Sequence, residues 1–394
     1  MRTVGTVVRG IRTPIIKEND DLANIVVDSL LEAAKEEKFE FRNKDIVAIT
    51  EAVVGISEGN YATVDDIAKD LLNKFPDKEV GIVFPILSRN RFSMILKGIA
   101  RAMDKVTILL SFPTDEVGNG ILDEELLIKS PYSVGDTFTE KEYYQYFDTF
   151  IHPFTGINMV DFYKELVEKE LCKVNFVFSN DPTAILKYTK NVLISDIHTA
   201  VKTRMAFENM EVSVFSLTDV LSSPIDGSGY NPTYGLLGSN MSTEERLKLF
   251  PKQGDILVKR VHELLKDKTG KNIEVMVYGD GAFKDPVGGI WELADPVVSP
   301  AYTVGLKGTP NEIKLKFISD NKFKDLSGEE LVSAMKNEIG SKETDLKGTM
   351  KTEGTTPRRI VDLVGSLCDL TSGSGDKGTP VVLVQGYFDN YSND

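Results

Sequence analysis

A glycine-rich loop near the C-terminus, residues 372–380, has the residue types that bind phosphate. It reads SGSGDKGTP, so a glycine recurs every second or third residue. Glycine readily adopts positive φ, which lets successive backbone N–H groups turn toward one anion. Lys377 adds a mobile positive charge and Thr379 a hydroxyl group. A flexible turn between a helix and a strand explains the loop equally well, since the phosphate-loop pattern G-x-x-x-x-G-K-[ST] does not occur in the chain.

A second group of charged residues follows a predicted strand at residues 273–278. The segment 279–286 reads GDGAFKDP and places Asp280, Lys284 and Asp285 just beyond the carboxyl end of that strand. Ligands of α/β proteins collect at this edge of the sheet. A carboxylate there can hold a hard cation together with phosphate oxygens, and the lysine can neutralise phosphate charge. An ordinary Asp-Gly turn is the competing interpretation.

Two further groups carry weaker signals. Arg89 and Arg91 follow an apolar strand, where they could grip an anionic group at a helix start or form a solvated surface. Asp196 and His198 form a D-x-H pair, for which a hydrogen-bonded structural histidine is the better interpretation. The chain has three histidines in all, so zinc or histidine-based nucleophilic chemistry has few candidates.

Composition bounds the function. With 394 residues, 41% hydrophobic and 27% charged, the chain is an ordinary globular protein of two or three domains. A net charge of −14 argues against nucleic acid or an anionic membrane as partner, because phosphates would be repelled. No apolar run reaches the ~18 residues of a membrane span. Cys172 and Cys368 fit small core residues in a reducing compartment, so a cytoplasmic location is expected.

Hydrophobic periodicity predicts an α/β fold in two parts. Between residues 81 and 221, apolar strands alternate with helices, which is typical of βαβ units and a parallel sheet. This block is long enough to be a domain of its own. The predicted strands are 4–9, 45–51, 81–87, 106–112, 174–179, 191–195, 212–217, 273–278 and 381–385. The main predicted helices are 22–35, 64–74, 91–103, 255–265, 327–339 and 358–370.

Five short segments, taken in order, resemble the γ-glutamyl ligases that act on the deazaflavin coenzyme F420-0. The first two are RTPIIKE with DDL at 12–22, similar to that family's nucleotide-contacting opening, and TEAVV through SEG at 50–59. Ser239-Asn240 resembles the end of the family motif D-x-x-S-N. The turn GDGAFK at 279–284 resembles S-D-[ST]-F-G-R, and residues 358–385 resemble the last helix, nucleotide loop and strand. The resemblance covers residues 1–80 and 222–394, so these residues are expected to form one mixed α+β body, and the parallel α/β block 81–221 is expected to be a domain inserted into it.

The resemblance implies a site for a nucleotide, GTP or ATP, and for Mg²⁺ or Mn²⁺. It implies a catalytic role for Asp280 and Lys284, and metal ligands among Asp280, Asp226 and Asp285. The implied nucleotide contacts are Arg12, Thr13, Pro14, Ile15, Thr50, Glu51, Asn240, Ser374, Gly375, Asp376, Lys377, Gly378 and Thr379. Two positions depart from the pattern. Leu237 stands where the family has its first metal aspartate, and Ile56 stands where many members have a lysine.

The implied reaction is the addition of L-glutamate to the terminal carboxylate of a small acceptor, coenzyme F420-0 or a folate, through an acyl phosphate. The chain is expected to form a homodimer and to bind neither nucleic acid nor membrane. Two other functions fit the same residues. One is a metal-dependent phosphohydrolase, and the other is a nucleotide-binding regulatory protein without activity, which the leucine at 237 would favour.

Overall fold

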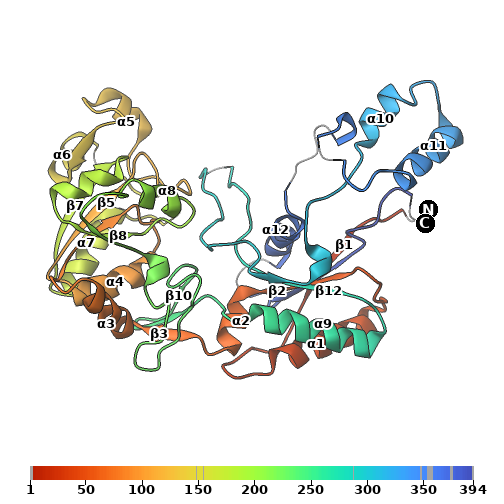
Figure 1. The fold of residues 1–394 in the computed structure, drawn as a ribbon, viewed down its shortest axis with the longest axis horizontal. Helices are drawn as coiled ribbons and strands as arrows, with labels where there is room; N and C mark the ends of the chain where they lie inside the picture. The colour runs from red at the N-terminus through yellow and green to blue at the C-terminus, as the bar shows by residue number, and fades with distance from the viewer. Residues whose placement is uncertain are drawn as a thin grey trace.

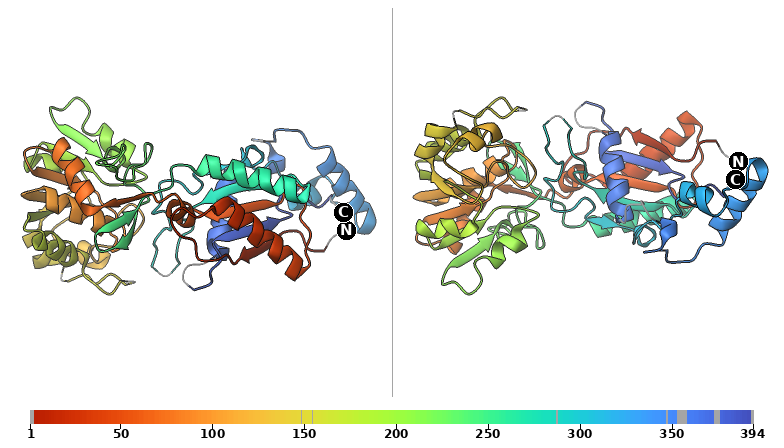
Figure 2. Two further views of the ribbon diagram at one scale, coloured as in Figure 1. Left: turned by 90° about the horizontal axis from the view of Figure 1, so that it is seen from below. Right: turned by 90° about the horizontal axis from the view of Figure 1, so that it is seen from above.

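The computed structural model describes residues 3–147, 149–153, 155–286, 288–346, 348–352, 358–372 and 376–392. It has a mixed α/β architecture with three sheets, as predicted. Two compact parts lie side by side, joined near β3 and β10, and both chain ends lie on the part at the right of Figure 1. The two views of Figure 2 show the same separation from below and from above. Among the described residues, no helix is both long and apolar enough to cross a lipid bilayer.

The first part, called the main body here, is built on a five-stranded sheet. Its strand order is β1 (Val7–Ile11), β14 (Val381–Gln385), β2 (Ile46–Thr50), β12 (Glu274–Tyr278) and β13 (Ala301–Tyr302). α1 (Leu22–Glu37) and α9 (Gly254–Thr269) cover one face, and α12 (Ile360–Ser372) covers the other. Alternate residues of the central strands feed the two cores. Burial on both faces explains why these strands are nearly continuous apolar runs.

The second part, called the second lobe here, is built on a six-stranded sheet. Its order is β6 (Thr137–Thr139), β7 (Lys173–Ser179), β5 (Lys105–Leu110), β4 (Glu79–Val83), β8 (Asn191–Ile194) and β9 (Ser213–Ser216). All neighbouring pairs are parallel except β6 with β7. The parallel sheet predicted from the alternating pattern is therefore confirmed. A small sheet of β10 (Asn240–Thr243), β11 (Arg246–Lys248) and β3 (Tyr61–Thr63) completes the set.

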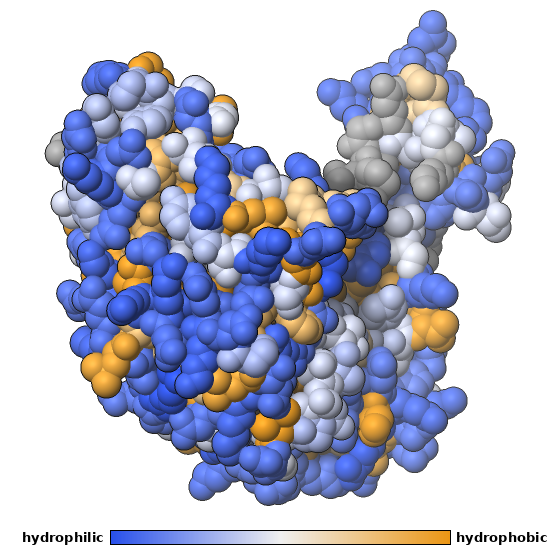
Figure 3. Space-filling model, turned by 60° about the vertical axis from the view of Figure 1, so that its left-hand side comes forward, coloured by the Kyte–Doolittle hydropathy of each residue, from blue (hydrophilic) through white to orange (hydrophobic). Residues whose placement is uncertain are grey.

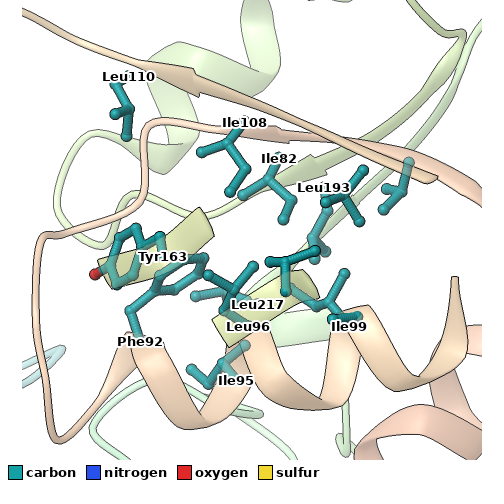
Figure 4. Packing of buried hydrophobic residues seen from close by; sticks show 14 of the residues in the cluster. Ile82, Phe92, Ile95, Leu96, Ile99, Ile108, Leu110, Tyr163, Leu193 and Leu217 are labelled. Atoms are coloured by element: carbon teal, nitrogen blue, oxygen red, sulfur yellow. The ribbon is translucent and has the colours of Figure 1, made fainter. Parts of the chain in front are cut away.

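The core of the second lobe lies between its sheet and α3 (Val64–Lys74), α4 (Phe92–Ala102) and α7 (Met159–Lys169). In Figure 4 Phe92, Leu96 and Ile99 of α4 point toward the strands, and Tyr163 of α7 lies beside Phe92. A capping box of Thr63 and Asp66 begins α3. Residues 61–74 and several leucines between 236 and 249 share this core. The division of the chain at residues 80 and 221 stays a prediction.

The remaining elements are short or peripheral. They are α2 (Glu51–Ser57), α5 (Glu124–Lys129), α6 (Glu140–Tyr146), α8 (Ala200–Met205), α10 (Leu315–Asn321), α11 (Gly328–Gly340) and the 3₁₀ turns at 182–187, 217–219, 304–306 and 350–352. α10 and α11 form an arm that projects from the main body. Figure 3 shows a hollow between this arm and the second lobe. Between β7 and β8, where the alternating pattern predicts a helix, the chain forms only the 3₁₀ turn Pro182–Lys187.

Candidate active site

Strand direction brings the predicted site segments to one edge of the main-body sheet. β2 and β12 are parallel, with Thr50 opposite Tyr278 at their carboxyl ends. β14 runs antiparallel to both β2 and β1, so the start of β14 lies at the same edge as the end of β1. Backbone hydrogen bonds link the loops there, from Thr50 N to Pro380 O at 2.9 Å and from Thr13 N to Gly378 O at 3.4 Å. Four segments far apart in sequence thus surround one space.

That space is a cavity of about 540 Å³. Most of the residues predicted to contact a nucleotide or a metal line it. These are Thr13, Pro14, Ile15, Thr50, Glu51, Asn240, Asp280, Gly378 and Thr379. Arg91, Tyr278, Asp369 and Ser372 line it as well. The buried Tyr278 hydroxyl lies at the wall of this cavity, near the side chains of Ser372 and Thr50.

Asp280 shares one arginine with a second carboxylate. The guanidinium of Arg91 bonds Asp280 Oδ2 at 2.9 Å and Asp295 Oδ1 at 2.6 Å. Asp295 also accepts the backbone N–H of Asp280 through its other oxygen, at 2.9 Å. The side chain of Asp295 is 1% exposed, whereas that of Asp280 is 23% exposed. Asp280 is therefore the member of the pair that faces the cavity.

The site has more negative than positive groups. The pKa of Asp280 is raised to about 7, chiefly by burial and then by the nearby Asp295, while Arg91 opposes the rise. Burial also raises the pKa values of Asp369 and Glu292, and neighbouring carboxylates add to both shifts. Burial acts against the charge on Arg91, but Asp295 and Asp280 raise its pKa, so it stays protonated. The carboxylates repel one another, and a bound cation would relieve that repulsion.

The turn that carries Asp280 is held by α12. Asp369 Oδ2 accepts the N–H of Gly281, and the Ser366 hydroxyl accepts that of Ala282, both at 2.9 Å. Gly279 comes so close to Asp295 that a Cβ there would lie 2.3 Å from Oδ2. A glycine is therefore required before Asp280, and the backbone position of the carboxylate is fixed from two sides.

Glu51 is bound to a lysine from the small sheet. Lys248 Nζ contacts the two carboxylate oxygens of Glu51 at 2.9 and 2.7 Å, and both side chains are buried. Burial raises the pKa of Glu51, while Lys248 lowers it. The ion pair joins β11 to the start of α2. Glu51 lines the cavity as predicted, but its carboxylate is committed to Lys248.

Several predicted site residues lie elsewhere. Lys284 pairs with Trp291 across an isolated bridge, and its Nζ lies 6.0 Å from the indole centroid. Asp285 accepts the N–H of Gly288 within the same turn. Asp226 forms an exposed ion pair with Lys69 of α3, at 2.9 Å. The structure therefore does not bring Asp226 together with Asp280, because its loop folds onto the second lobe.

The C-terminal loop is only partly described. Asp376, Lys377 and Gly378 are exposed, and Gly378 has a φ of 66°. The Thr379 hydroxyl donates to Ser372 O at 3.0 Å, which ties the end of the loop to the end of α12. Arg12 is exposed at the rim. Ser374 and Gly375 lie outside the described residues.

A scan against protein families matches residues 10–386 to the F420-0:Gamma-glutamyl ligase family. The match includes the second lobe and spans nearly the whole chain. The chain belongs to this family. A search of curated proteins found no match. The resemblance noted in the flanking segments is therefore confirmed, and ligation of glutamate to F420-0 is the activity that the family indicates.

A ligase of this family is expected to hold a divalent cation, and the donor chemistry at the sheet edge fits one. Asp280 and Asp369 offer hard oxygen ligands, and burial, with a further contribution from Asp295, raises the pKa of both. Across the described part of the chain, no three carboxylate, imidazole or thiolate groups are arranged to hold an ion as they stand. Arg91 already occupies one oxygen of Asp280 and one of Asp295. At the position of the missing family aspartate, Leu237 is a core residue, 5% exposed.

Three charged residues of the site were missed by sequence reasoning. Asp295 and Asp369 occur in no short motif, and Lys248 is one of many lysines. Arg91 was noted as a residue that could grip an anion at a helix start. It does so just before α4, but the anions are the protein's own carboxylates.

Proposed function

We propose that the cavity binds a nucleoside triphosphate with Mg²⁺ or Mn²⁺ and uses it to join L-glutamate to the terminal carboxylate of an acceptor. The observation that carries the proposal is the meeting of four predicted nucleotide and metal segments around Asp280. Coenzyme F420-0 is the acceptor that the family name indicates, and a folate is the alternative. Both end in a carboxylate that can be extended.

The reaction needs no protein nucleophile. An oxygen of the acceptor carboxylate attacks the γ-phosphorus, the nucleoside diphosphate leaves, and an acyl phosphate forms. The amine of glutamate then attacks the acyl carbon, phosphate leaves, and the amine loses a proton to water. Such chemistry depends on positioning and on neutralising the charge of the transferred phosphoryl group.

The cavity residues divide this work by their places around it. Residues 13–15 and Asn240 would frame the base and ribose, since they lie at the rim beside β1 and β10. Lys377, Gly378 and Thr379 would hold phosphates through a charge, backbone groups and a hydroxyl. Asp280 and Asp369 would hold the cation, which supplies positive charge to the phosphate oxygens.

The test is a reaction screen with the purified full chain. Radiolabelled L-glutamate is supplied with F420-0 or a folate, with GTP or ATP, and with Mg²⁺ or Mn²⁺. We expect labelled acceptor and nucleoside diphosphate in equal amounts, and no rapid nucleotide turnover when glutamate or acceptor is omitted. Turnover that needs neither would show a phosphohydrolase. Binding without turnover in any mixture would show a regulatory protein. The expected homodimer stays a prediction for light scattering, and the cytoplasmic location rests on the two buried free cysteines.

A further inference from the structure

The second lobe contributes a positively charged side chain, that of Arg91, to the active site of the main body. Arg91 stands directly before α4 of the second lobe, yet its guanidinium reaches Asp280 beyond the end of β12 and Asp295. Its side chain is 18% exposed. The active site and the second lobe are thus joined through the guanidinium of Arg91.

The position of Arg91 is fixed by the lobe's own core. Next to it in sequence, Phe92 packs against Tyr163. The Tyr163 hydroxyl accepts the N–H of Ser88 at 2.8 Å, and the Ser88 hydroxyl accepts the N–H of Arg91 at 3.1 Å. The loop before α4 is also held by Asp115, which accepts the N–H of Leu87. The backbone of Arg91 therefore follows the second lobe.

The two contacts of the guanidinium differ. The contact with Asp295 is shorter, and that carboxylate is almost fully buried and is also fixed by the backbone of Asp280. The contact with Asp280 is longer and more exposed. Of the two, the Asp280 contact is the one that can open toward the cavity. Opening it leaves one end of the guanidinium on Asp295 and frees N–H donors at the cavity wall.

We propose that Arg91 is a positioning residue that holds Asp280 in the ligand-free protein and gives it up when the divalent cation binds. The freed guanidinium end then faces the anionic ligand while its other end stays on Asp295. This rests on the proposed function. The second lobe then has a role in the reaction, because Arg91 is anchored in that lobe. Its guanidinium competes with the metal ion for the carboxylate of Asp280 and then contacts the nucleotide phosphates.

Binding of Mn²⁺ alone distinguishes this role from an ordinary structural ion pair. Free Mn²⁺ is measured by its paramagnetic resonance signal for the wild-type chain, Arg91→Gln and Arg91→Lys. Arg91→Gln removes the competing cation, so it should bind Mn²⁺ about tenfold more tightly, one step of 1.4 kcal/mol. Arg91→Lys keeps the charge but cannot bridge both carboxylates, and its affinity should lie between the two.

The same variants should respond in the opposite direction to nucleotide. With Mn²⁺ saturating, GTP or ATP should bind Arg91→Gln about tenfold more weakly, because a phosphate contact is lost. Arg101→Gln is the matched control. Arg101 also bridges several carboxylates, Glu170, Asp65 and Glu245, but these lie on the second lobe and the small sheet. Its Mn²⁺ and nucleotide affinities should equal those of the wild type.

A folded Arg91→Gln that binds Mn²⁺ no more tightly than the wild type overturns the inference and leaves the proposed function standing. If Arg91→Gln does not fold, Arg91→Lys is compared with the wild type instead. Weaker Mn²⁺ binding by Arg91→Lys than by the wild type would then overturn the inference and leave the proposed function standing. If the wild-type chain and every folded variant bind neither Mn²⁺ nor nucleotide, the proposed function fails and the inference fails with it.

Discussion

Both larger sheets gather carboxylates at the carboxyl ends of their parallel strands, but the two groups have different partners. In the second lobe, Asp115 accepts the N–H groups of Leu87, Val117 and Asn119 and the Asn119 side-chain amide, at 2.7–3.0 Å. Glu116 accepts three consecutive backbone N–H groups, from residues 197 to 199. In the main body, Asp280 and Asp295 share Arg91, and Asp369 and Glu292 stand near them.

The difference shows which acids are structural and which can bind a ligand. Burial raises the pKa of Asp115 to about 6, and its hydrogen bonds to Asn119 and the backbone oppose the rise. For Asp280 the second cause after burial is another carboxylate. Fixed donors satisfy the first acid within the fold. The second acid is left short of positive charge, and clusters of this kind are typical of functional sites.

The largest expected effect is on catalysis, at Asp280, which shares the guanidinium of Arg91 with Asp295. Asp280→Asn should lower the ligation rate by roughly two to four orders of magnitude, about 3–5 kcal/mol of barrier, since a charge that holds the cation is lost. Its melting temperature should stay equal to that of the wild type or rise, because removal of the charge relieves repulsion by Asp295. Labelled-glutamate incorporation and a circular dichroism melt measure the two quantities. Near wild-type ligation by this variant would show that Asp280 holds no metal.

The matching change in the second lobe should act on stability. Asp115→Ala leaves buried N–H groups of Leu87, Val117 and Asn119 without an acceptor, so it should destabilise the protein by roughly 2–4 kcal/mol. Urea denaturation followed by tyrosine fluorescence and circular dichroism measures this loss. Asp115→Asn, which keeps one acceptor oxygen, should lose less. If Asp115→Ala is as stable as the wild type, the contrast between the two groups of acids is wrong.

The pH dependence of stability sharpens the comparison between Asp280 and Asp115. Asp280 has a folded-state pKa of about 7, above its ordinary value of 3.8, so its contribution favours the folded state at low pH and is lost as the pH rises through 7. Between pH 6 and pH 8, in the absence of divalent cations, the free energy of unfolding should fall by about 1 kcal/mol. The fall should be much smaller in Asp280→Asn. It should persist in Asp115→Asn, because the pKa of Asp115, about 6, lies at the lower end of that range.

The sequence was informative about those parts of the site whose position follows from the direction of the strands. Apolar runs predicted β2, β12 and β14, and residues that follow parallel strands share an edge with residues that precede an antiparallel one. Thr50, Asp280 and Thr379 therefore line one cavity, although 329 positions separate the first from the last. α3 and β14 have the predicted bounds because clear signals flank them, a capping box in one case and Pro380 in the other.

Side-chain partners between distant elements were not predictable. Arg91 reaches Asp280 only because the second lobe packs beside the main body, and no local pattern encodes that approach. Asp369 reaches the turn at Gly281 from the last part of α12. The sequence indicated that acidic residues lie near a metal ion, but it did not indicate how many. The resemblance offered Asp226 or Asp285 beside Asp280, but Asp226 pairs with Lys69 of α3.

The smallest expected effect belongs to Asp226, and it tests that choice directly. The resemblance offered this acid, among others, in place of the aspartate missing at Leu237, but its side chain is 70% exposed and is paired with Lys69 of α3. Exposed ion pairs contribute little to stability because water and salt screen them. Asp226→Asn should therefore leave the ligation rate, the Mn²⁺ affinity and the melting temperature unchanged. The same substitution at Asp280 serves as the positive control in each assay. A hundredfold loss of ligation in a folded Asp226→Asn would mean that the loop at 222–240 moves onto the main body during the reaction. The acids of the second lobe and those of the main body would then not be independent. The second lobe would supply the metal ion with a ligand, Asp226, as well as with a competitor, Arg91.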